Sequence, residues 1–180
     1  MQTDFTNITY LKKGNQKQQA AYDLLVQYTI MDQLQQFDPV LVGTIPIGID
    51  TDKSDLDIIC CFNDQSAFEE HLQQAFGQHS QFNTYIVTHL QQLSVVANFY
   101  LANFEIEIFG QHIPTQKQYA YRHMIIEDRL LKKYGEAFRK QVIDLKTKGH
   151  KTEPAFALLL ELQGDPYEAL LQFSSDIGSV

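Results

Sequence analysis

The sequence is poor in residues that crosslink a chain or build a zinc site. Its 180 residues include only two cysteines, Cys60 and Cys61, which are adjacent. On a strand, adjacent side chains point to opposite faces, so these two are poorly placed to form a disulfide with each other. No further ligands follow at the spacing of a zinc finger. We therefore expect reduced core cysteines and a cytoplasmic location, where thiols stay reduced.

Long apolar runs are also missing. The longest aliphatic stretch, from Ala155 to Leu160, is far too short to span a bilayer. Near the N-terminus, Lys12 and Lys13 are not followed by an apolar run, as they would be in a signal peptide. We expect neither a membrane span nor a signal peptide.

Positive charge is scarce. There are 14 lysines and arginines against 22 aspartates and glutamates, which gives a formal net charge of -8. An acidic surface repels phosphate backbones, so broad nucleic-acid binding is disfavoured. One basic stretch, which contains Lys132, Lys133, Arg139 and Lys140, is interpreted as a solvated helix face.

Hydrophobic periodicity predicts strands and helices in the first two thirds of the chain. Apolar residues at three- and four-residue steps predict a helix over Gln16 to Leu34, and a second helix is expected over Ser66 to Phe76. Short apolar or alternating runs predict strands over 40–42, 56–62, 82–88, 93–100 and 104–109. The run over 56–62 is apolar almost throughout, which is typical of an interior strand.

From Thr115 onward only helices are expected. Four helical segments, 119–134, 136–146, 153–162 and 167–173, are separated at Gly135, Gly149 and Gly164. The whole pattern predicts an α/β (α+β) fold with a sheet and flanking helices. We place the core in residues 1–112 and a C-terminal helical segment, packed on that core, in residues 113–180.

A short stretch of the first part carries the candidate chemistry. Asp55 and Asp57 are two residues apart at the start of a strand, so their side chains share a face, with Cα atoms about 6.5 Å apart. Two carboxylates ~4 Å apart repel by on the order of 4 kcal/mol at an effective dielectric constant of 20. A cation such as Mg²⁺ offsets this repulsion and prefers oxygen ligands. Upstream, Gly43 allows a phosphate to approach the backbone N–H groups, and Thr44 adds a hydroxyl donor.

This stretch resembles the DNA polymerase beta-like nucleotidyltransferase superfamily. The family pattern is an apolar residue, Gly, Ser or Thr, a second Gly, and Ser-Asp-x-Asp on a strand. Here it is formed by Leu41-Val42-Gly43-Thr44, Gly48 and Ser54-Asp55-Leu56-Asp57. A third carboxylate on a later strand completes the family pattern, and Phe104 to Phe109 provides it. The resemblance covers residues 39–110 and implies a nucleotidyltransferase-like mixed sheet.

The resemblance also implies roles for these residues. In such enzymes three carboxylates hold two divalent metal ions, so Asp55, Asp57 and Glu107 would be catalytic and would bind Mg²⁺ or Mn²⁺. The nucleotide would be bound by three residues of the loop before the strand, namely Gly43, Thr44 and Ser54.

Three further segments bear on the resemblance. Many members carry a basic or polar residue between the two glycines, whereas this chain has Ile45-Pro46-Ile47. The segments Glu107–Gln111 and Tyr121–Met124 resemble a small branch of bacterial proteins with no assigned function, which adds no activity.

The third carboxylate is either Glu107 or Glu105, because both lie on the same face of one strand. The aspartates sit at the start of their strand. An antiparallel neighbour would place its end beside them and favour Glu107, whereas a parallel neighbour would favour Glu105. We assign Glu107, which is followed closely by the end of the strand at Gly110.

The helical part offers one more candidate. His123 and Glu127 are one helical turn apart, and such a pair most often lies on the surface. In the alternative, Arg122 or His123 points into the cleft and contacts substrate. The remaining histidines show no ligand spacing and receive no role.

Two functions of different classes remain open. In the first, the protein is a transferase that moves a nucleoside monophosphate from an NTP to an unidentified acceptor, which the acidic surface tilts towards a small molecule or a protein hydroxyl. In the second, the protein is a non-catalytic nucleotide- or partner-binding module on the same fold, as the apolar Ile45-Pro46-Ile47 favours. The oligomeric state is left open.

Overall fold

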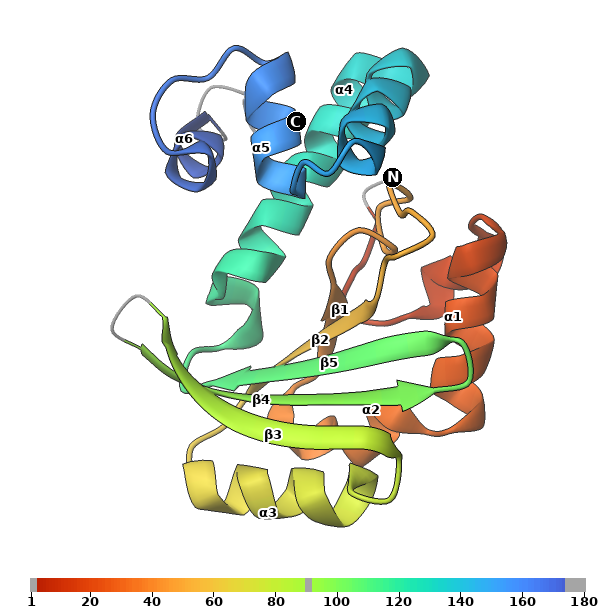
Figure 1. Ribbon diagram of the computed structural model, residues 1–180, viewed down its shortest axis with the longest axis vertical. Coiled ribbons are helices and arrows are strands. Elements are labelled where there is room, and N and C mark those ends of the chain that lie inside the picture. Colours follow the sequence, from red (N-terminus) through yellow and green to blue (C-terminus); the bar gives the residue numbers. More distant parts are fainter. Residues whose placement is uncertain (1–2, 90–91, 174–180) are drawn as a thin grey trace.

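A five-stranded mixed sheet forms the centre of the computed structural model, which describes residues 3–89 and 92–173 (Figure 1). The strands are β1 (Val40–Val42), β2 (Leu56–Cys61), β3 (Ser80–His89), β4 (Gln92–Leu101) and β5 (Phe104–Gln111), in the order β1-β2-β5-β4-β3. β2 and β5 are parallel, and the other neighbouring pairs are antiparallel. β2 is paired on both sides, as its apolar sequence predicts.

Alternation along the strands gives the sheet two different faces. In β5, Ile106 and Ile108 are fully buried in one core, whereas Glu105 and Glu107 are half-buried on the opposite face. Strand side chains alternate between the faces, so this face collects the polar residues of β5. We call it the open face.

The helices of the first part cover the other face. They are α1 (Gln16–Gln27), α2 (Ile30–Gln33) and α3 (Gln65–Phe76), and with the sheet they enclose a core that includes Leu24, Phe68 and Phe99. Short 3₁₀ helices are η1 (Thr9–Lys13), η2 (Gln35–Phe37) and η3 (Thr115–Lys117). The prediction of one helix over 16–34 is wrong, because α1 ends at Gln27 and Thr29 adopts a left-handed conformation with φ 51°.

A second core joins the C-terminal helices to the β1 and β2 edge of the open face. These helices are α4 (Tyr119–Thr147), α5 (Thr152–Leu159) and α6 (Pro166–Phe173). Val40, Val42 and Ile59 point from the strands into this core, where they meet Leu130 and Phe156. Figure 1 shows α4, α5 and α6 gathered at the end of the molecule opposite α3.

The predicted break at Gly135 is confirmed. α4 continues through this position, but Gly135 has φ 77° and ψ -166°, a backbone conformation almost restricted to glycine. The break redirects the second half of α4, which carries Arg139 and Lys146 towards the loop between β1 and β2.

The predicted α/β (α+β) fold with a mixed sheet and flanking helices is confirmed. Cys60 is buried, Cys61 is half-buried, and both are free, as expected. Within the described residues, none of the helices combines the length and the hydrophobicity that a membrane span requires.

Candidate functional site

A cleft of about 680 Å³ lies between the open face of the sheet and the C-terminal helices. Its sheet wall contains every residue proposed from the sequence for metal and nucleotide binding: Gly43, Thr44, Ser54, Asp55, Asp57 and Glu107. Its helical wall carries polar residues from α4, α5 and α6 and from the segment between α4 and α5: His123, Glu127, Lys146, His150, Glu153 and Tyr167. The two walls face each other across a volume typical of small-molecule sites.

The pairing of β2 with β5 brings two carboxylates together. Asp57 is the register partner of Glu107, so the two residues sit on neighbouring strands, which lie about 4.8 Å apart. The antiparallel arrangement that favoured Glu107 is wrong, because β2 and β5 run parallel. Glu107 nevertheless lines the cleft. The register pairs Leu56 with Ile106 and therefore pairs the next residue, Asp57, with Glu107. Glu105 lies outside the lining and accepts a hydrogen bond from Tyr100 Oη at 2.8 Å.

The carboxylates of the sheet wall destabilise one another's charged forms. Burial, together with the charges of Asp55 and Glu107, raises the pKa of Asp57 to about 8 against the lowering effect of Lys146. Burial also raises the pKa of Glu107, although a hydrogen bond from Asn98 Nδ2 at 3.3 Å lowers it. The site therefore holds more negative charge than the protein itself balances.

This donor set fits a hard divalent cation. Asp55, Asp57 and Glu107 offer only carboxylate oxygens, the ligands that Mg²⁺ prefers. Among residues 3–89 and 92–173, no three His, Cys, Asp or Glu side chains converge closely enough to form a ligand cluster as they stand. An ion held by all three carboxylates would require their side chains to rotate towards one another.

Gly43 touches the carboxylate of Asp57. Its φ is +82°, and a Cβ built on it would lie 2.2 Å from Asp57 Oδ2. Any larger residue would both strain the backbone and collide with the acid. The loop that Gly43 begins is closed by Thr44 Oγ1 and Ser54 Oγ, which lie 3.0 Å apart, while Ser54 Oγ accepts from Thr51 N at 2.9 Å.

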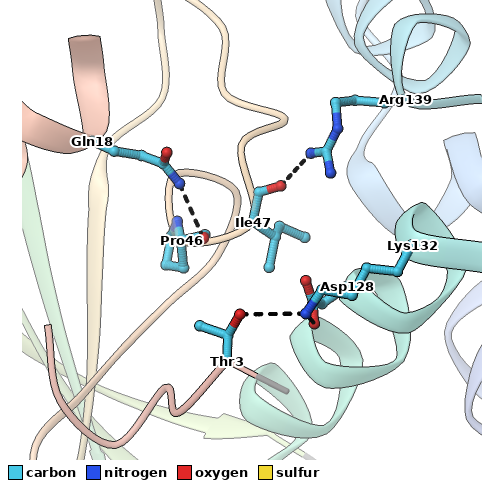
Figure 2. A network of polar contacts seen from close by, with 7 residues as sticks. All are labelled: Thr3, Gln18, Pro46, Ile47, Asp128, Lys132 and Arg139. Atoms are coloured by element: carbon cyan, nitrogen blue, oxygen red, sulfur yellow. Dashed lines mark hydrogen bonds and ion pairs between the residues drawn. The ribbon is translucent and has the colours of Figure 1, made fainter. Parts of the chain in front are cut away.

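Side chains from two helices hold this loop in place. Gln18 Nε2 of α1 donates to the carbonyl oxygens of Ile45 (2.8 Å) and Pro46 (3.1 Å). Arg139 Nη1 of α4 donates to the carbonyl oxygens of Ile47 and Gly48. Figure 2 shows Gln18 and Arg139 reaching the loop from their separate helices.

The apolar loop residues have a structural explanation. Ile45 and Ile47 are buried, and Ile45 belongs to the first core whereas Ile47 belongs to the second. The departure from the family pattern at these positions therefore anchors the loop in both cores. The interpretation of Arg139 as part of a solvated helix face is wrong, because its guanidinium is bound to loop carbonyl groups.

The helical wall contains residues to which the sequence gave little or no role. His123 and Glu127 are 5% and 4% exposed, so the interpretation of them as a surface pair is wrong. His150 lines the cleft although no role was assigned to it, whereas Arg122 is exposed, does not line the cleft and lies with Cζ 5.5 Å from the Tyr119 ring centroid.

Lys146 is a cleft cation that sequence reasoning missed. Its Nζ donates to Ile49 O at 2.7 Å, and burial lowers its pKa to about 8 against the opposing charges of Glu127, Asp50 and Asp55. The sequence signal was weak, because the residue sits in a helix with several other basic residues. Only the packing of α4 on the loop turns it towards the carboxylates.

Several solved structures share the fold of this chain. This chain is similar to a chain of the GLD-2/RNP-8 complex, with TM-score 0.54, 14% identity, and coverage of 84% of this chain and 60% of that one. It is similar to Cid1 poly(U) polymerase bound to Mg 3'-dATP, with TM-score 0.54, 10% identity, and coverage of 91% and 52%. It is also similar to the polymerase core of TRAMP, an RNA surveillance complex, with TM-score 0.51, 10% identity, and coverage of 93% and 52%. This chain therefore spans only 52% to 60% of these known chains, and the likeness establishes the fold.

One sequence family also matches. The model of a family described as a domain of unknown function (DUF4269) matches residues 23–173. The matched span contains every cleft residue named above. No curated protein has a sequence that matches this chain.

The raised pKa of Asp57 gives a pH prediction for the metal-free protein. Between about pH 4 and pH 8 the folded state keeps a proton that the unfolded state has released, because the pKa is about 8 against an ordinary 3.8. The free energy of unfolding should therefore fall as pH rises through this window, by at most about 1.4 kcal/mol per pH unit. Asp57→Asn removes this contribution.

We expect Asp57→Asn, in EDTA, to be more stable than the parent by a margin that grows from pH 4.5 to pH 8. Denaturant unfolding at several pH values measures the margin. Exposed Asp52→Asn controls for the general loss of one negative charge. A margin for Asp57→Asn that shrinks as pH rises would show that Asp57 has a stabilising cationic partner instead.

The contact between Gly43 and Asp57 predicts a coupling between two substitutions. Gly43→Ala should destabilise the metal-free protein by at least about 1–3 kcal/mol, the usual cost of a strained backbone, with the collision adding to it. In an Asp57→Ala background the collision is gone, so the same change should cost less. Chemical denaturation of the four proteins of this cycle measures the difference. Equal costs in both backgrounds would mean that the two residues do not interact.

Proposed function

The chain belongs to the DUF4269 family, and we propose that its cleft transfers a nucleoside monophosphate from an NTP to an acceptor. The observation that carries this proposal is the register of β2 and β5, which places Asp57 beside Glu107 in a cleft that Gly43 also lines. The nucleotidyltransferase-like fold agrees with it. The compartment is proposed to be cytoplasmic.

In this proposal Asp55, Asp57 and Glu107 hold Mg²⁺ or Mn²⁺. When bound, the metal ions neutralise phosphate charge and orient the reacting groups, which is most of the catalysis that phosphoryl transfer requires. The carboxylates are suited to this role because their charges are otherwise poorly balanced. Binding of the cations relieves that repulsion.

The loop between β1 and β2 binds the triphosphate. Gly43 brings the backbone close to the carboxylates, and Thr44 and Ser54 place two hydroxyl groups at the loop ends. Carbonyl oxygens of the loop accept hydrogen bonds from Gln18, Arg139 and Lys146, so these oxygens do not repel the phosphates. A preorganised loop loses little conformational entropy when the nucleotide binds.

The reaction is a displacement at the α-phosphorus. The acceptor oxygen forms a bond to that phosphorus, the bond from the phosphorus to the bridging oxygen breaks, and pyrophosphate leaves with the bonding electron pair. The acceptor hydroxyl loses its proton to Glu107, whose pKa is raised by burial, and the proton then passes to solvent.

A non-catalytic binding module is the second candidate. It is favoured by one observation, that the carboxylates of the described residues do not converge into a ligand cluster. The apolar loop residues no longer support it, because their burial explains them. The two candidates differ in whether pyrophosphate is released.

Paired substitutions on β5 test the proposal. We expect Glu107→Gln to lower Mg²⁺-dependent pyrophosphate release by about 100-fold or more, the usual scale for removing one preorganised electrostatic group. Glu105→Gln removes the same charge two residues away, outside the cleft lining, and should stay within a few-fold of the parent. The assay combines each NTP, Mg²⁺ or Mn²⁺ and a metabolite pool.

Two outcomes would contradict the proposal. Loss of activity in Glu105→Gln with full activity in Glu107→Gln would show that Glu105, and not Glu107, is the third carboxylate. Nucleotide binding that is equally tight in EDTA and in Mg²⁺, with no pyrophosphate from any NTP, would favour the binding module.

A further inference from the structure

A second acidic group lies across the cleft from the three carboxylates of the sheet. Glu127 on α4 is 4% exposed, and the side chain of Glu153 on α5 is 21% exposed. Both line the same cleft as Asp57 and Glu107. The transfer reaction proposed above uses neither of them, so their presence needs a separate explanation.

Glu127 has a hydrogen-bonding atom without a partner. Its Oε1 is buried, and no group of residues 3–89 and 92–173 donates a hydrogen bond to it. A buried acceptor that stays unpaired is costly, and native structures seldom leave one without a reason. Because Glu127 faces the cleft, a bound ligand with a donor group would satisfy this oxygen.

The neighbouring cleft residues do not supply that donor. Burial, and then the charge of Glu153, raise the pKa of Glu127 well above its usual range. Lys146 offsets this only in part, and its Nζ donates to Ile49 O at 2.7 Å. His123 Nε2 lies 3.1 Å from Tyr167 O, and a carbonyl oxygen only accepts, so Nε2 carries the ring proton. Its Nδ1 lies 3.7 Å from Glu153 Oε1.

Glu127 Oε1 therefore lacks a donor on its own side of the cleft. A bound ligand with donor groups would supply the missing hydrogen bond beside two acidic side chains. An ammonium group brings three donors and a positive charge, and a carboxylate binds it more strongly than it binds a neutral donor. A phosphate or carboxylate group would bring no donor for Glu127 Oε1 and would lie beside two acidic side chains.

The charge of the whole cleft points the same way. Its lining contains five carboxylic acids, Asp55, Asp57, Glu107, Glu127 and Glu153, but only three lysines, Lys53, Lys146 and Lys151. Divalent metal ions and a triphosphate carry opposite charges that largely cancel. The excess of acid therefore remains for the other substrate.

We propose that Glu127 and Glu153, with His123, form the acceptor subsite, and that the acceptor is a small molecule carrying an ammonium group beside its reactive hydroxyl. Calling this site the acceptor subsite depends on the proposed transferase function. The binding of an ammonium group at this site does not depend on it. The buried depth of Glu127 favours a small molecule over a protein side chain. A polynucleotide is disfavoured because its phosphates meet the same acids.

The test measures the binding of three probes by calorimetry, in EDTA and again in Mg²⁺ with a non-hydrolysable ATP analogue. Spermidine supplies ammonium groups, triethylene glycol supplies a chain without charge, and a short oligoadenylate stands for a polynucleotide end. We expect the parent to bind spermidine at least tenfold more tightly than either of the other probes in both conditions.

Two isosteric variants locate the binding. Glu127→Gln and Glu153→Gln should each weaken spermidine binding by about tenfold or more, as expected for losing a hydrogen bond to a charged group. Glu105→Gln removes an equal charge outside the cleft lining and should change the affinity less than twofold. Thermal melts verify that each variant folds, and Glu153, being less buried, tests the subsite if Glu127→Gln does not fold.

The outcomes separate this inference from the proposed function. Unchanged spermidine affinity in Glu127→Gln and Glu153→Gln, or equal binding of triethylene glycol, overturns the subsite even if Mg²⁺-dependent nucleotide binding is intact. Tighter binding of the oligoadenylate than of spermidine overturns it in favour of a polynucleotide acceptor. Amine binding that needs Glu127, in a protein that binds no Mg²⁺-nucleotide, supports the subsite and contradicts the transferase.

Discussion

Repulsion among carboxylates packed on one face of a sheet is the constraint that shapes this cleft. Asp57 lies against the Gly43 backbone and beside its register partner Glu107. The negative charges of Asp55 and Glu107 both disfavour its charged form. Ion pairing within the protein does not remove this repulsion, since Lys146, the one cation that lowers the pKa of Asp57, is itself buried and bonded to the loop. Such a group offers the oxygen ligands that a divalent cation prefers.

The loop between β1 and β2 shows how the fold supports this arrangement. It must bring Gly43 against an acid while its carbonyl groups stay out of the cleft. Gln18 from α1 and Arg139 from α4 bind these carbonyl groups, and the isoleucines of the loop enter the two cores. The loop thus links the sheet to the C-terminal helices, so the two walls of the cleft share one support.

Sequence reasoning found the sheet wall because local spacing determines it. Asp55 and Asp57 share a face through the period of a strand, and the same alternation places Glu105 and Glu107 together on one face. The relative direction of β2 and β5 was not accessible in this way, since β3 and β4 lie between them in the chain and alternation is the same in both directions. Glu107 was therefore chosen for a reason that the structure does not support, although its register places it in the cleft.

The helical wall was harder to predict because it depends on tertiary packing. Glu127 and Lys146 look like ordinary charged residues of a long helix, and only the break at Gly135 and the packing on β1 turn them inwards. Arg139 looked solvated for the same reason. The hydrogen bonds that Gln18 and Arg139 donate to carbonyl groups of the loop have no signature in a single sequence.

The central claim is that Asp55, Asp57 and Glu107 together bind a metal ion that carries a nucleotide. Its most direct test is a crystal structure of the protein with Mn²⁺ and a non-hydrolysable ATP analogue, with anomalous data that identify the manganese. We expect a manganese peak within about 2.5 Å of carboxylate oxygens of Asp55, Asp57 and Glu107, a range set by metal–oxygen bonds, with the triphosphate at Gly43 and Thr44. A nucleotide bound elsewhere, or bound in this cleft without manganese at the carboxylates, would contradict the claim.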